Sequence, residues 1–194
     1  MSLADKLSTV FNASAVILVA AVVTQGTSHA FGPVKLLKND LVAIKTFLTG
    51  SKGHLEIRDR QLKNLTHTGS LEITNSSIEN LTNLGSLKVS DNSHISSFAQ
   101  FGSVKVQDSY FGKGAITGST KFTNSHIDSV EISADTINLK NTEVQSDVIV
   151  NDPRNGGESK VTLDASIIHG QLICKKHCEV FEFNGSVVEG GIIN

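Results

Sequence analysis

Apolar and polar residues alternate in a short block that recurs along most of the chain. Each block opens with glycine and then alternates apolar and polar side chains, as in residues 69–73 and 85–89. Alternation at every second residue is the pattern of a β-strand with one buried face. The pattern therefore predicts a series of short, similar strands.

The blocks follow one another at nearly constant spacing. The first apolar positions of successive blocks are 16 or 17 residues apart up to Ile137, and the last two intervals are longer. These positions are Leu55, Leu71, Leu87, Val104, Thr120, Ile137, Val161 and Phe181. The longer steps contain a loop at 151–157 and the segment 174–178. The last two units match position for position when Val161 is aligned with Phe181.

A unit this short is typical of one coil of a β-solenoid, in which neighbouring coils hydrogen-bond at about 4.8 Å. A β-sandwich also has closely spaced strands, but its strands need not resemble one another. We therefore expect an all-β, single-stranded β-solenoid with coils of about 16–17 residues over 53–194. Its inward positions in one unit are Leu71, Ile73, Ile78 and Leu81.

The first thirty residues are predicted to be a signal peptide. Residues 15–23 form an apolar run that is too short to span a bilayer, and Ser28 and Ala30 are the small residues that signal peptidase requires. The alternative is an uncleaved N-terminal anchor. Cleavage after Ala30 would deliver the mature chain to the periplasm or outside the cell, and no later segment is apolar enough to cross a membrane.

Residues 31–52 fit two interpretations. Helical spacing of Leu37, Leu41, Ile44 and Leu48 would give a capping helix that ends before Gly50. We favour a first, irregular coil, because the apolar spacing from Val34 to Phe47 repeats that from Leu55 to Thr68.

Composition argues against several functions. The chain has 17 basic and 19 acidic residues and a net charge of −2, so it gives no reason to expect nucleic acid or an anionic membrane as partner. Aromatic residues make up 5% and tryptophan is absent, so the core must be built from Ile, Leu, Val and a few Phe. No catalytic motif, cofactor motif or metal-ligand cluster stands out, and we expect a protein that is not an enzyme.

Aspartate and asparagine recur two residues after the second apolar position, at Asp59, Asn75, Asp91, Asp108, Asn124 and Asn141. These side chains tolerate left-handed backbone, so the column is predicted to be a corner with a side-chain ladder. Serine or threonine follows, for example Ser109 and Ser125, and is expected to point inward. A catalytic Asp–Ser pair would occur once, whereas this pattern repeats in every coil.

One outward column contains Lys88, Lys105 and Lys121 in succession. Stacked lysines repel one another unless an anion or a neighbouring carboxylate compensates them, and Glu72 lies next to Lys88. The column is either a solubilising face or a strip for an anionic polymer such as an envelope glycan.

The two cysteines, Cys174 and Cys178, are predicted to form a disulfide in an exported protein. With His177 between them, a metal site and free thiols are the alternatives. The remaining histidines of the mature chain do not occupy one column, so no shared histidine site is expected; they are His54, His67, His94, His126 and His169.

The closing units resemble the coils of bactofilins, the polymer-forming bacterial β-helix proteins. The resemblance lies in the segments Ser166-Ile167-Ile168-His169-Gly170-Gln171-Leu172-Ile173 and Ser186-Val187-Val188-Glu189-Gly190-Gly191-Ile192-Ile193. It implies a right-handed β-helix and end-to-end assembly. Bactofilins are cytosolic, whereas this chain has an apparent export signal, and in that respect it also resembles exported repeat proteins of Gram-negative bacteria.

The C-terminal coil is the expected assembly surface. Phe181 and Phe183 are the bulkiest apolar pair of the repeat, and Ile192 and Ile193 follow with no polar cap after them. We expect a structural or interaction protein of the envelope that self-associates, or docks a partner, at this end. The alternatives are that a loop covers the edge, that the lysine strip binds a glycan, and, least favoured, that the chain is a polysaccharide-degrading enzyme.

Overall fold

The computed structural model describes residues 47–153 and 156–194; the predicted signal peptide and residues 31–46 lie outside this part of the chain. Its regular structure is entirely β. The strands are β1 (Phe47–Arg58), β2 (Gln61–Thr74), β3 (Ser77–Leu84), β4 (Leu87–Ser90), β5 (His94–Phe101), β6 (Val104–Gln107), β7 (Tyr110–Thr117), β8 (Thr120–Thr123), β9 (His126–Ser133), β10 (Thr136–Lys140), β11 (Glu143–Val144), β12 (Val148–Asn151), β13 (Ser159–Asp164), β14 (Ile167–Ile168), β15 (Leu172–Cys174), β16 (Cys178–Phe183), β17 (Val187–Val188) and β18 (Ile192–Ile193).

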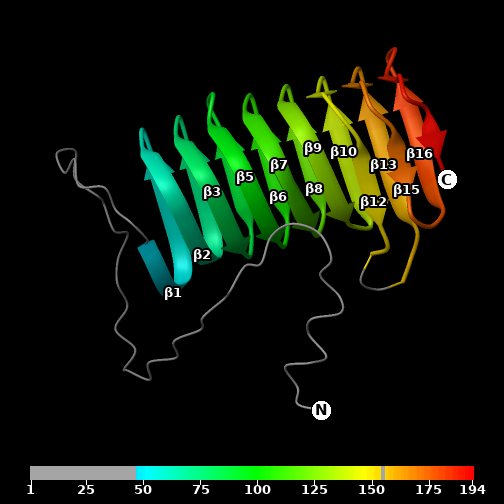
Figure 1. Ribbon diagram of the computed structural model, residues 1–194. Helices are drawn as coiled ribbons and strands as arrows, with labels where there is room; N and C mark the ends of the chain where they lie inside the picture. The colour runs from blue at the N-terminus through cyan, green and yellow to red at the C-terminus, as the bar shows by residue number, and fades with distance from the viewer. Residues whose placement is uncertain (1–46, 154–155) are drawn as a thin grey trace. The chain divides into compact units, whose positions relative to one another are not determined.

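The strands form a parallel β-solenoid of about 8 turns, with turns about 17 residues apart. Each strand pairs in parallel with the equivalent strand of the next coil, as β4 does with β6 and β5 with β7. Figure 1 shows these coils stacked side by side from β2 to β16. The predicted all-β solenoid is therefore confirmed.

The core is a set of stacked apolar columns. Leu71, Ile73, Ile78 and Leu81 are at most 2% exposed, which confirms their predicted inward orientation. Leu84 differs, because it is 41% exposed at the point where the coil turns.

The Asp/Asn column forms a corner, as predicted. Its residues have positive φ, from 46° at Asn75 to 59° at Asp91. The side chains also bond between coils: the Asn75 amide donates to Asp59 (2.6 Å) and that of Asn124 donates to Asp108 (3.0 Å). The serines that follow are buried, and the hydroxyl of Ser109 donates to the Gln107 carbonyl at 2.8 Å.

Residues 47–52 belong to β1, so this part of the expected first coil is a strand. Its register differs from the alignment, because Phe47 pairs with Leu65 and not with Thr68. The register shifts again between Thr49 and Gly53, after which Gly53 pairs with Gly69.

The last coil also departs from the alignment. Phe181 pairs with Thr162, so Val180 is the residue opposite Val161. The alignment of Val161 with Phe181 was therefore wrong by one residue in this strand. Asn184 and Gly185, with φ of 53° and 76°, form a turn that restores the predicted pairing of Val187 with Ile167.

Candidate functional site

A groove runs across several coils where the repeat glycines lie. Gly85, Gly102 and Gly118 have φ of 129–138° and contribute no side chain to the surface. The backbones approach closely there: a Cβ on Gly102 would lie 2.1 Å from the carbonyl oxygen of Gly85. The missing side chains leave an open groove of about 420 Å³.

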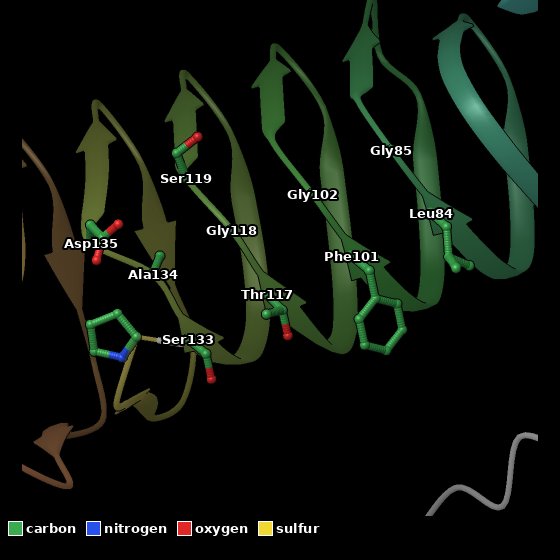
Figure 2. A pocket seen from close by; sticks show the side chains of 11 residues that line it. Leu84, Gly85, Phe101, Gly102, Thr117, Gly118, Ser119, Ser133, Ala134 and Asp135 are labelled. Carbon is green, nitrogen blue, oxygen red and sulfur yellow. The ribbon is translucent and has the colours of Figure 1, made fainter. Parts of the chain in front are cut away.

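The two walls of the groove differ in chemistry. Leu84, Phe101, Thr117 and Ser133 form one side in successive coils, and Leu84 and Phe101 are 41% and 43% exposed (Figure 2). Ser119 lines the other side, while Asp135 and Pro153 lie at the end toward the later coils. One side of the groove is therefore apolar at Leu84 and Phe101 and carries hydroxyl groups at Thr117 and Ser133, and the other side carries the Ser119 hydroxyl.

A buried polar cluster holds the floor of the groove. Gln100 is 1% exposed, and its side-chain amide donates to the Gly85 carbonyl at 2.6 Å. The amide of Asn83, which is fully buried, donates to the Gln100 side-chain oxygen at 2.9 Å. Buried amides that are bonded in this way fix the backbone, because losing either partner would leave a buried polar group unsatisfied.

The predicted lysine strip lies beside the groove. Lys88, Lys105 and Lys121 are exposed and stack in register in β4, β6 and β8. Ser119 directly precedes β8 and lies two residues before Lys121, and both side chains are exposed.

Only one end of the strip has a neighbouring carboxylate among the described residues. Lys88 Nζ lies 2.7 Å from Glu72, and this hydrogen bond lowers the pKa of the Glu72 carboxyl. No ion pair of Lys105 or Lys121 occurs in the described part of the chain. The uncompensated charge is therefore concentrated beside the middle of the groove.

The histidines are not as dispersed as the sequence suggested. His94 and His126 share one column with Tyr110 between them, and the rings stack at 4.2 Å and 5.3 Å with interplanar angles of 5° and 11°. The five histidines do not all occupy one column, as expected, but two of them do. The signal is in the sequence, since Tyr110 and His126 lie two positions after Asp108 and Asn124, and His94 lies two positions after Asn92, which also has positive φ. Because the rings stack on one another, their facing surfaces contact a neighbouring ring in the ladder.

His169 links three coils near the C-terminus through two hydrogen bonds. The His169 ring nitrogens lie 2.9 Å from Glu189 and 2.9 Å from Glu143. These two hydrogen bonds raise the pKa of His169, and the bond from His169 lowers the pKa of Glu143. Only the imidazolium form can donate to both carboxylates.

Cys174 and Cys178 are joined as a disulfide, as expected, with their Cα atoms 5.9 Å apart. Both side chains are buried. The bond removes the two thiolates that the alternative metal site would need. No group of three or more potential metal ligands occurs among the described residues.

The last coil, β16 to β18, exposes the apolar residues that the sequence indicated. Phe181, Phe183, Ile192 and Ile193 are 42%, 52%, 41% and 47% exposed. The inserted loops do not cover these side chains. They contact each other instead, through an ion pair between Lys176 and Asp152.

Strand β16 pairs with a neighbouring coil on one side only in the structure. The Phe183 carbonyl accepts from the Ala165 N–H (3.1 Å) and thus faces the preceding coil. Successive residues of a strand direct their peptide groups to opposite sides, so those of Val180 and Glu182 face the free edge. The Asn194 side chain satisfies the peptide groups of Cys178. Its Oδ1 accepts from the Cys178 N–H at 2.8 Å, and its Nδ2 donates to the Cys178 carbonyl at 3.0 Å.

No model of a known protein family matches the chain, and neither a curated protein nor a solved structure gives a significant match. The described residues include no helix that is long and apolar enough to cross a membrane. The function must therefore be argued from the surfaces of the solenoid.

Proposed function

We propose that this chain is an exported, non-enzymatic β-solenoid that assembles with further copies of itself and has a structural role in the bacterial envelope. One observation carries the proposal. Among the described residues, six of the eight exposed large apolar side chains lie in the last two coils: Ile167, Phe181, Phe183, Val187, Ile192 and Ile193. Exposed apolar clusters of this kind mark interaction surfaces.

A second copy of the chain is the partner that fits this surface. The free edge of β16 offers peptide groups at Val180 and Glu182, and among the described residues β1 pairs on one side only, with β2. A parallel strand edge is a template for another strand of the same kind. Stacking of β1 of one copy on β16 of another would continue the parallel ladder and cover the apolar side chains.

Two features of the sequence support the cellular part of the proposal. The predicted signal peptide at 1–30 would export the chain to the periplasm or beyond it. The resemblance of the closing units to bactofilin coils, a family that polymerises, is in keeping with end-to-end assembly.

Sedimentation velocity tests the assembly. The purified protein should sediment faster as its concentration rises, and both Ile192→Lys and Ile193→Lys should hold it as a monomer, because a charge at the interface would be desolvated on assembly.

Ala115→Lys is the matched control. Ala115 is exposed and occupies the same outward column as Ile193, several coils away. This variant adds the same charge and should assemble like the parent chain. A parent chain that stays monomeric at every concentration, or equal loss of assembly in Ala115→Lys, would contradict the proposal.

A further inference from the structure

We propose that the groove over Gly85, Gly102 and Gly118 binds a linear acidic polysaccharide. This inference goes beyond the assembly proposed above and does not depend on it, since the groove lies on the central coils. In this inference the lysine strip lies beside the binding site, and the residues that line the groove belong to other columns.

The shape of the groove suits an extended polymer. The glycine column crosses four successive coils from Gly85 to Ala134, which corresponds to roughly 14 Å at one strand spacing per coil. The groove is open along its length, so a chain can lie in it without threading. Its lining also repeats once per coil, as the sugars of a polysaccharide repeat along their chain.

The walls offer the contacts that sugars use. Phe101 is 43% exposed, so part of its ring is free to pack against the C–H face of a pyranose. Its aromatic neighbours in the core, Phe98 and Phe111, pack against each other instead. On the other wall, the Ser119 side chain is exposed and can exchange hydrogen bonds with sugar hydroxyls.

Charge favours an acidic polymer over a neutral one. Lys105 and Lys121 flank the side of the groove that carries Ser119 and have no ion-pair partner in the described part of the chain. Asp135 lies at the Pro153 end, so the acidic groups are expected over the Gly102 and Gly118 coils. Lysines stacked at strand spacing repel one another, and a bound carboxylate would relieve this repulsion.

The floor is preorganised. Gln100 and Asn83 bond each other below the glycine column, and Gln100 also holds the Gly85 carbonyl. A rigid floor means that little backbone has to be ordered on binding, which improves affinity.

Binding of polygalacturonate, alginate and hyaluronate, measured by titration calorimetry, tests the inference. At least one of these acidic polymers should bind, and the affinity should fall as salt is raised. Phe101→Ser and the double variant Lys105→Glu/Lys121→Glu should each weaken binding by tenfold or more. The methyl ester of polygalacturonate should bind more weakly than the free acid wherever the acid binds.

Two matched controls separate the groove from the rest of the surface. Phe183→Ser removes an exposed phenylalanine from the assembly surface, and Lys113→Glu reverses an exposed charge in a different column. Both should bind like the parent chain. The inference is overturned if none of the three acids binds, if the ester binds as well as the acid, or if the controls lose as much affinity as the groove variants. A loss of assembly in Phe183→Ser with intact binding would bear on the proposed function alone.

Discussion

At the scale of single residues, the glycine column is the most restrictive feature of the sequence. Gly102 has a φ of +129°, and a Cβ there would lie 2.1 Å from the Gly85 carbonyl oxygen. Gly102→Ala should therefore lower the free energy of unfolding by about 2–4 kcal/mol, because backbone strain and a backbone clash coincide. Urea denaturation would measure the change.

Gly53→Ala is the control for this prediction. A Cβ at Gly53 would meet no atom within 4 Å, and its φ is not in the left-handed region. The substitution should change stability by less than about 1 kcal/mol. Similar effects of the two substitutions would show that the close approach of Gly102 does not limit the fold.

The sequence predicted those residues whose role repeats in every coil. The Asp/Asn corner and the buried column of Leu71 and Ile73 follow from alternation and spacing alone. The groove was missed because it consists of absent side chains, and glycine in a sequence indicates a turn before it indicates a surface.

At the scale of elements, strand register limits what the sequence can predict. In Val180-Phe181-Glu182-Phe183, apolar residues occupy both alternating sets, so the hydrophobic pattern allows two registers. The structure takes the one with Val180 opposite Val161, and an added residue in the turn at Asn184 and Gly185 makes this register possible. The phenylalanines consequently lie outside the core and belong to the surface that we propose for assembly.

The bridge from Glu143 through His169 to Glu189 gives the C-terminal coils a pH dependence. The raised pKa of His169 stabilises the fold below the ordinary histidine value of about 6.5, and this contribution is lost as the pH rises through the raised value. The lowered pKa of Glu143 stabilises the fold above the ordinary value of 4.5, and that contribution is lost as the pH falls through the lowered value. The bridge is thus strongest between the two ordinary values. His126 also faces Glu143, at 3.7 Å.

Urea midpoints measured across this range would test the bridge. The parent chain should be more stable near pH 5.5 than near pH 8.5, and His169→Gln should remove most of the difference because glutamine does not titrate. His177→Gln, at an exposed histidine in the disulfide loop, should leave the difference in place. A parent chain with equal stability at both values of pH would show that the bridge does not form in solution.

At the scale of the whole solenoid, stability is a sum of contributions from neighbouring coils. The inner coils have a neighbour on both sides, whereas β16, β17 and β18 have one on a single side in the structure. Opening of the last coil therefore costs less free energy than opening of a central one. Amide hydrogen exchange of the dilute protein should be fast at Val180 and Glu182, and slow at Ile137 and Leu139 in β10.

Assembly should change the rate of amide hydrogen exchange in the last coil only. A second copy on the free edge would pair the peptide groups of Val180 and Glu182, so their exchange should slow as the protein concentration rises, while exchange in β10 should not change. Ile193→Lys should abolish the concentration dependence, and Ala115→Lys should retain it. If sedimentation showed growth but these amides gained no protection, the copies would be joined through another surface, and the exposed residues of the last coil would need a different partner.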